Sequence, residues 1–214
     1  MAATTKRIGV FICTIRRPRC NPQIANFVTQ SIQSLHPSPP EGISAPPYSL
    51  HTVDLADWKL PFVDEPDIPS QIHDPSKYVH EHTRKWSAEV SGYDGFVFVT
   101  PQYNWGYPAV LKNAIDYLYG EWKNKAALVV SYGGRGGGRA NAQLRQVLQG
   151  VNITPTTKSV ELKFPSREFL EQAAHGKQLE LDGKGKGHVW SDERLQIGEA
   201  FAELLTLLAS AKLD

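Results

Sequence analysis

Short runs of apolar residues recur along the chain, and polar or glycine-rich stretches separate them. Residues 8–13 read Ile-Gly-Val-Phe-Ile-Cys, a continuous apolar run typical of a strand that is buried on both faces of a sheet. Four further runs have the length and the apolar content of strands. The predicted strands are residues 8–13, 48–54, 95–100, 126–132 and 156–163.

Between these runs, apolar residues recur every three or four positions, which is the spacing of one helix face. The first such segment opens at Asn21-Pro22, where we expect Asn21 to cap the helix and Pro22 to occupy its first position. The last opens at Ser191, which precedes two acidic residues in the first turn. Helices are also predicted at 76–91, from Pro108 onward and at 139–149, whereas 36–47, 55–75 and 164–190 are predicted to be irregular.

Strands that alternate with helices predict an α/β fold, a parallel sheet with helices on both faces. Five strands are compatible with either common doubly wound strand order. No repeat or linker divides the sequence, so we expect one domain over residues 1–214, with a core at about 6–163 and a C-terminal helix at about 191–211. Ligands of such folds bind at the carboxyl ends of the strands. The loops after the first, third and fourth strands are therefore the candidates for a site.

The charge balance and the cysteine content narrow the classes of function. The 23 lysines and arginines are matched by 22 aspartates and glutamates, so a generally basic surface for nucleic acid is not expected. Two cysteines are too few for a disulfide framework and indicate a reducing compartment. No stretch approaches the ~20 apolar residues of a membrane helix. We therefore expect a cytoplasmic protein with neither a nucleic-acid nor a membrane partner.

The loop after the first strand carries three arginines. Arg16, Arg17 and Arg19 lie just before a helix N-terminus, whose free N–H groups favour an anion. Thr14 adds a hydroxyl donor, and arginine is suited to bidentate contact with phosphate. The loop lacks the G-x-G-x-x-G and G-K-[ST] patterns of dinucleotide and nucleoside-triphosphate sites. It therefore predicts a phosphate site of another kind, and the alternative is a solvated basic loop.

The loop after the third strand, residues 100–108, combines three aromatic residues with the side-chain amides of Gln102 and Asn104. Planar rings beside amide groups suit a flat heteroaromatic ligand. Pro101 and Pro108 stiffen the two ends, which lowers the entropy lost when the loop is ordered. The alternative is an aromatic corner that only packs.

The loop after the fourth strand contains five glycines within residues 133–138. Glycines let backbone N–H groups approach a ligand closely. An RNA-binding segment of the Arg-Gly-Gly type is disfavoured, because the run is single and lies between a strand and a helix. A plain flexible turn is the stronger alternative.

These three loops resemble those of the NADPH-dependent FMN reductase family, which includes quinone, azo-dye and chromate reductases of the flavodoxin-like fold. Residues 13–23 match its phosphate loop in spacing, with Cys13 at a glycine position and Thr14 at a serine position. Residues 101–116 match its flavin loop, P-E-Y-N-x-x-x-P-x-x-L-K-N-A-[IL]-D, nearly throughout, with Gln102 in place of the usual glutamate. Tyr132-Gly133-Gly134 corresponds to its third loop.

The resemblance implies a flavodoxin-like sheet of strand order 2-1-3-4-5 and an FMN cofactor that carries a hydride from NADPH or NADH to a quinone or similar acceptor. It implies that the flavin performs the chemistry, so we expect no catalytic side chain and no metal. It also implies a homodimer or homotetramer. The segments 36–47, 55–75 and 164–190 depart from the family by being longer than a minimal member needs, and since such loops would edge the flavin pocket, they leave the range of substrates open. The family's cofactor-binding positions fall here on Thr14, Arg16, Arg19, Pro22, Gln23, Ile24, Pro101, Gln102, Tyr103, Asn104, Trp105, Tyr132, Gly133 and Gly134.

Two other functions stay open at this point. A flavodoxin-type electron carrier would resemble an acidic protein with a hydroxyl-rich, arginine-free phosphate loop, and this chain has three arginines and a balanced charge. A regulatory module that uses the redox state of its flavin as a signal would share the same motifs.

Three further features have plain structural interpretations. His80-Glu81-His82 does not indicate a metal site, because residues two apart on a helix point to different faces. Cys20 lies beside arginines that could lower its pKa, but a small loop residue is the simpler interpretation. Trp122 lies among lysines and is either an interface anchor or a residue that packs on its own domain.

Overall fold

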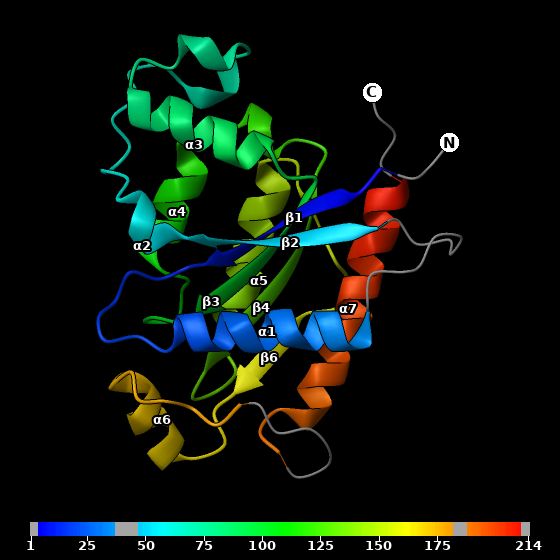
Figure 1. The fold of residues 1–214 in the computed structure, drawn as a ribbon. Coiled ribbons are helices and arrows are strands. Elements are labelled where there is room, and N and C mark those ends of the chain that lie inside the picture. Colours follow the sequence, from blue (N-terminus) through cyan, green and yellow to red (C-terminus); the bar gives the residue numbers. More distant parts are fainter. Residues whose placement is uncertain (1–3, 37–46, 182–187, 211–214) are drawn as a thin grey trace.

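The computed structural model describes residues 4–36, 47–181 and 188–210 (Figure 1). The strands are β1 (Lys6–Ile12), β2 (Tyr48–Asp54), β3 (Gly95–Pro101), β4 (Ala126–Gly133), β5 (Thr154–Pro155) and β6 (Val160–Lys163). They form one parallel sheet in the order β2-β1-β3-β4-β5, and β6 also pairs with β4. The predicted flavodoxin-like order is confirmed. All the predicted candidate loops leave the sheet at the same edge, because parallel strands end on the same side.

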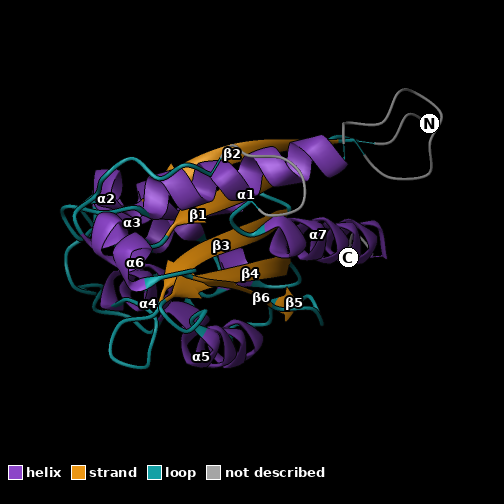
Figure 2. Ribbon diagram, turned by 90° about the horizontal axis from the view of Figure 1, so that it is seen from below, coloured by secondary structure: helices purple, strands orange, loops and turns teal. Residues whose placement is uncertain are grey.

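Helices cover both faces of the sheet (Figure 2). They are α1 (Asn21–Leu35), α2 (Leu55–Trp58), α3 (Glu81–Ser91), α4 (Ala109–Asp116), α5 (Gly138–Gly150), α6 (Arg167–Ala174) and α7 (Ser191–Ser210). Successive strand residues point to opposite faces, so Val10 and Phe11 enter two different cores. Val10 packs in the core that includes α1 and α7, and Phe11 in the core that includes α3, α4 and α5. No helix in the described ranges is long and apolar enough to cross a membrane.

The start of α1 differs from the prediction in one respect. Cys20 is the N-cap residue, and Asn21 is already inside the helix. The Asn21 side chain is fully buried, and its Nδ2 donates a hydrogen bond to the Val99 carbonyl oxygen at 3.1 Å. Asn21 therefore connects the first turn of α1 to the carboxyl end of β3, and it does not cap its own helix.

The single strand predicted at 156–163 is wrong, because the chain bends between β5 and β6. The Thr156 hydroxyl donates to the Lys158 carbonyl oxygen. Glu203 of α7 accepts hydrogen bonds from the backbone N–H groups of Thr157 and Lys158. These side-chain contacts satisfy backbone groups that would otherwise pair in a strand ladder.

The remaining differences concern helix boundaries. The helix predicted at 76–91 begins only at Glu81, since residues 75–77 form a separate 3-10 turn. The segments 55–75 and 164–190 are not wholly irregular, because they contain α2 and α6. The predicted loop at 36–47 falls outside the described residues except for its two ends, as does residue 211 of the predicted C-terminal helix.

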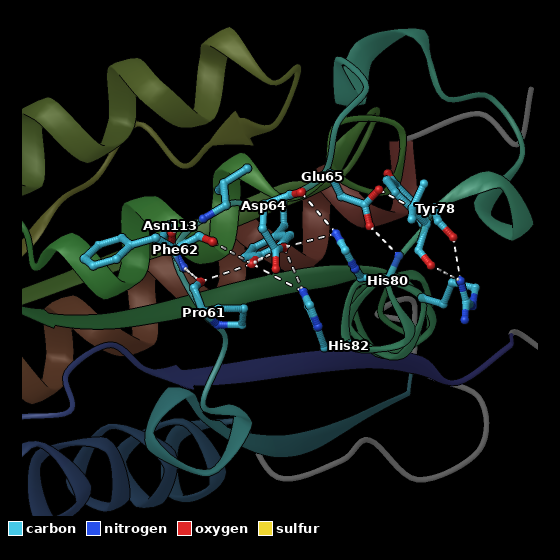
Figure 3. A network of polar contacts seen from close by, with 12 residues as sticks. Pro61, Phe62, Asp64, Glu65, Tyr78, His80, His82 and Asn113 are labelled. Carbon is cyan, nitrogen blue, oxygen red and sulfur yellow. Dashed lines mark hydrogen bonds and ion pairs between the residues drawn. The ribbon is translucent and has the colours of Figure 1, made fainter.

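The long segment after α2 is attached to α4 by the side chain of Asn113 (Figure 3). Its Nδ2 donates to the Pro61 carbonyl oxygen at 2.7 Å, and its Oδ1 accepts from the Val63 N–H at 3.0 Å. Phe62 lies between these two anchored residues, and its side chain is 84% exposed. Asn113 thus fixes the backbone of this segment while leaving an aromatic ring in solvent.

The two histidines at the start of α3 lie side by side (Figure 3). Their rings stack at 5.1 Å, so the expectation that His80 and His82 point apart is wrong; His80 has extended backbone and precedes the helix. His82 Nε2 lies 2.9 Å from Asp64 Oδ1, and Tyr117 donates to the same oxygen at 3.0 Å. Desolvation opposes the charged form of Asp64, but these hydrogen bonds outweigh it and lower the pKa of the carboxyl. No histidine, cysteine or carboxylate cluster suited to a metal occurs among the described residues.

Trp122 packs inside its own domain. Its side chain is fully buried in the core that contains Phe96, and its indole N–H donates to the Ile115 carbonyl oxygen at 3.1 Å. The alternative interpretation of Trp122 as an interface anchor is therefore wrong.

Candidate functional site

The three predicted loops meet at a pocket of about 210 Å³ at the carboxyl edge of the sheet. Of the residues predicted to bind a cofactor, those on the pocket wall are Arg16, Arg19, Pro101, Gln102, Tyr103, Tyr132, Gly133 and Gly134. The rest of the wall consists of residues that were not predicted to bind the cofactor. Pro18 and Cys20 lie within the first loop motif, whereas Phe164, Leu170, Ala173 and Ala174 lie outside all three motifs.

The loop after β1 is braced by a carboxylate from β2. The Arg19 guanidinium contacts both oxygens of Asp54, at 2.8 and 2.5 Å, and also donates to the Thr14 carbonyl oxygen at 2.7 Å. The hydrogen bond with Asp54 raises the pKa of Arg19, which therefore stays charged. Asp54 is a site residue that the motifs missed. Its position at the carboxyl end of a strand next to β1 was the available signal, since such ends meet at one edge.

Arg16 and Arg17 differ from Arg19, because neither has a carboxylate partner in the described part of the chain. The Arg16 guanidinium lies 5.9 Å from the centre of the Tyr103 ring, on the pocket wall. The backbone N–H groups of Ile15 and Arg17 likewise have no hydrogen-bond partner among the residues described. A free cation beside free N–H donors is an arrangement that favours an anion such as phosphate.

The loop after β3 folds back as a tight turn. Tyr103 and Gly106 exchange two backbone hydrogen bonds, at 2.8 and 3.0 Å. The two residues between them, Asn104 and Trp105, have positive φ values of 45° and 73°. Asparagine adopts this conformation readily, but for a residue as bulky as tryptophan it is an outlier. The Tyr103 hydroxyl lies 2.8 Å from Thr14 Oγ1, which connects this turn to the loop after β1.

The side chain of Gln102 connects the second loop to the third. Its Oε1 accepts hydrogen bonds from the N–H groups of Arg139 and Ala140 at the start of α5, both at 3.2 Å. In the third loop Gly137 has φ +85°, and a Cβ there would lie 3.0 Å from the Tyr132 carbonyl oxygen. Glycine is therefore required for the backbone to turn this closely.

Several predicted residues lie beside the pocket and do not line it. Ile24 is fully buried in the core, and Thr14 is buried behind the loop. Gln23 holds the chain that follows α6, with Nε2 donating to the Lys177 carbonyl oxygen and Oε1 accepting from the Leu179 N–H. Pro22 and Gln23 border a separate hollow, and Asn104 and Trp105 lie at the exposed turn.

Helix α6 forms the outer wall of the pocket and lies beside the start of α1 (Figure 1). The backbone after it approaches the loop after β1 so closely that a Cβ at Gly176 would lie 2.9 Å from Pro18 Cβ. Phe164 and Phe169 pack against each other and against Trp190, which supports the wall from behind. The expectation that the segment 164–190 edges the pocket is consistent with this arrangement.

Two titratable groups on the wall are neutral. Burial raises the pKa of the Cys20 thiol despite the nearby Arg16, and burial raises the pKa of the Tyr132 hydroxyl well above its usual value. Neither is poised to donate or accept a proton near neutral pH. The wall is suited to holding a ligand with a phosphate and a flat ring.

Comparison with known proteins agrees with this geometry. The model of the NADPH-dependent FMN reductase family matches residues 6–165. An NAD(P)H-dependent FMN reductase of Saccharomyces cerevisiae is 43% identical over 161 residues, 74% of this chain and 81% of that protein. A quinone reductase of Pseudomonas putida is 30% identical over 148 residues, 66% of this chain and 68% of that protein.

The fold of this chain is also similar to those of solved structures. An oxidoreductase of Corynebacterium diphtheriae matches with a TM-score of 0.64 over 97% of this chain and 99% of that chain, at 16% identity, which shows a shared fold. The family match begins at the first residue of β1 and ends just beyond β6, so it spans the whole sheet. This chain belongs to the NADPH-dependent FMN reductase family.

Proposed function

We propose that this FMN-dependent NAD(P)H oxidoreductase holds FMN in the pocket described above and passes its electrons to a quinone or a similar small acceptor. The observation that carries the proposal is the convergence of the loops. The free cation of Arg16, the aromatic turn and the glycine loop all border one pocket. Such a set of groups suits a phosphate and a flat ring in the same ligand.

In this proposal the first loop binds the phosphate of FMN. Arg16 and the free N–H groups beside it contact the phosphate, while Arg19 and Asp54 keep the loop in shape. The backbone N–H groups of Asn104, Trp105 and Gly134 have no partner in the described ranges and are available to the flavin ring. The supporting residues are Thr14, Pro22, Gln23, Ile24, Pro101, Gln102, Tyr103, Tyr132 and Gly133.

The donor set fits FMN, and the size of the pocket predicts how the cofactor is exposed. The enclosed volume of about 210 Å³ is below the roughly 300–1,000 Å³ of pockets that enclose a drug-sized ligand. Part of the cofactor would therefore stay open to other molecules. FMN, when bound, takes a hydride from reduced nicotinamide and passes it to the acceptor. The open side gives both substrates one shared place to bind, so they must use it in turn.

Two observations support an apolar electron acceptor, namely the apolar lining of the pocket and the name of one relative. Phe164, Leu170 and Ala173 present carbon surface to the pocket, and the relative in Pseudomonas putida is named a quinone reductase. The test is steady-state kinetics of the purified protein with NADPH and benzoquinone, after its visible spectrum has been recorded. We expect a flavin spectrum and parallel double-reciprocal lines. Intersecting lines would contradict the shared place, and no turnover without an added reductase would indicate an electron carrier.

We also propose that the protein is a cytoplasmic homodimer or homotetramer and that residues 1–214 form one domain. The partly enclosed pocket supports assembly, since a second chain can supply a further wall and exclude water. Cys13 and Cys20 are both free and buried, which is compatible with a reducing compartment.

A further inference from the structure

An exposed aromatic residue and an arginine are stacked at the edge of the pocket. The Arg139 guanidinium carbon lies 3.6 Å from the centre of the Trp105 ring, which is a close cation–π contact. The Trp105 side chain is nevertheless 53% exposed. The pair adjoins the pocket through Gln102, which lines the wall and accepts the backbone N–H of Arg139. We name Trp105 and Arg139 the rim pair.

The backbone around the rim pair is strained, and it fixes the position of the pair. Trp105 has φ +73°, a left-handed backbone conformation that is strained for a residue of this size. The next residue, Gly106, lies against α5 so closely that a Cβ there would be 3.1 Å from Oε1 of Gln143. The turn is thus fixed along α5 with its tryptophan directed to solvent. Packing in the core does not account for a strained and exposed ring.

The charge of the rim pair is available to a ligand. Arg139 has no carboxylate partner in the part of the chain that the structure describes, and Arg135 in the preceding loop has none either. A guanidinium binds phosphate oxygens in a bidentate manner, and an indole offers a flat face for stacking. A ligand that is flat and also carries phosphate matches both groups.

We propose that the rim pair binds the phosphate-bearing part of the nicotinamide dinucleotide. The inference rests on the proposed function, since the donor must reach a flavin in the adjoining pocket. Arg139 contacts a phosphate of the donor, and Trp105 provides the surface on which a ring of the donor stacks. Neither residue takes part in the transfer of the hydride. The rim pair distinguishes the dinucleotide from electron donors that lack phosphate.

The test compares two hydride donors in rapid-mixing reduction of the FMN-loaded protein. One is NADPH, and the other is 1-benzyl-1,4-dihydronicotinamide, which is neutral and carries no phosphate. Arg139→Gln should lower the second-order rate constant for NADPH about tenfold more than that for the neutral donor, because a charge-assisted contact is lost. Lys158→Gln removes the same charge from an exposed position on the bend between β5 and β6, and should leave the ratio of the two constants unchanged.

Salt dependence provides a second readout. Added salt should slow reduction by NADPH in the natural protein and have less effect in Arg139→Gln. A ratio that stays at the natural value in Arg139→Gln would overturn the inference, as would an equal loss with both donors. If Arg139→Gln loses its FMN, Arg139→Lys serves instead: an ammonium group cannot make the bidentate contact or the stacking on Trp105, so the ratio should fall about threefold or more, and a ratio at the natural value would overturn the inference. A flavin that neither donor reduces would contradict the proposed function itself.

Discussion

Arg16 and Arg19 are three residues apart, but we expect different roles for them because their interaction partners differ. Arg19 is committed to Asp54 and the Thr14 carbonyl, whereas Arg16 has no carboxylate partner among the described residues. Arg16→Ala should therefore weaken FMN binding, with a dissociation constant about ten- to a hundredfold higher, and leave the fold of the apo protein intact. Fluorescence titration with FMN measures this. Arg17→Ala is the matched control, because Arg17 does not line the pocket; unchanged affinity in Arg16→Ala would contradict the phosphate assignment.

Lys125 provides a pH-dependent contribution to stability that can be isolated from the rest. Its ammonium group is mostly buried and donates to the Val90 carbonyl oxygen, and this burial lowers the pKa of Lys125 to about 8. In the unfolded chain the ordinary pKa is about 10.4. Between these values the unfolded state binds more protons, so stability rises with pH.

The variant Lys125→Met lacks this titration. The free energy of unfolding of the natural protein, minus that of the variant, should therefore increase from pH 8 to pH 10, by about 3 kcal/mol at most. Urea unfolding at several pH values in this range measures the difference. Other titrating groups are common to both proteins and cancel. A difference that does not change with pH would show that the charged form of Lys125 is not destabilised by the fold.

At the scale of secondary-structure elements, an element could be predicted from the sequence when most of its residues are buried, because burial requires a recognisable run of apolar residues. Every residue of β3 is buried, so its continuous apolar run is visible in the sequence. Only Phe169 and Ala173 of the eight residues of α6 are buried, and this short pattern is hidden among polar neighbours. The loop motifs identified the inner wall of the pocket because their residues are contiguous. Asp54 and Leu170 reach the same site through tertiary contacts, which no local pattern records.

The position of α6 at the outer wall of the pocket predicts that its side chains slow the dissociation of FMN. Leu170→Ala should accelerate the dissociation of FMN about tenfold, because it removes carbon surface from the outer wall. Arg167→Ala is the control on the same helix, since the Arg167 side chain is almost fully exposed and, within the described ranges, pairs only with Glu171 on its own helix. Stopped-flow release of FMN into excess apoflavodoxin measures both rates. Equal rates in the two variants would show that α6 does not contact the cofactor.

At the scale of the whole molecule, four large apolar side chains are exposed within one stretch of chain. They are Phe62, Val63, Ile68 and Val79. Since Trp122 is buried, this stretch replaces it as the candidate interface. We expect sedimentation to show a species of at least twice the mass of one chain, and Phe62→Ser to weaken it about tenfold or more. A monomer at all micromolar concentrations would contradict the assembly; an unaltered association constant in Phe62→Ser would remove this stretch from the interface.

The pocket joins residues near the beginning of the chain, such as Arg16 and Pro18, to α6 near its end. During translation the loop after β1 is therefore synthesised long before α6, which forms the outer wall of the pocket. A nascent chain that ends at residue 165 already contains every strand of the sheet, yet it lacks both α6 and the helix that covers the core beside α1. If FMN binds in this pocket, its binding site is complete only after α6 has been synthesised and has packed beside the loop after β1.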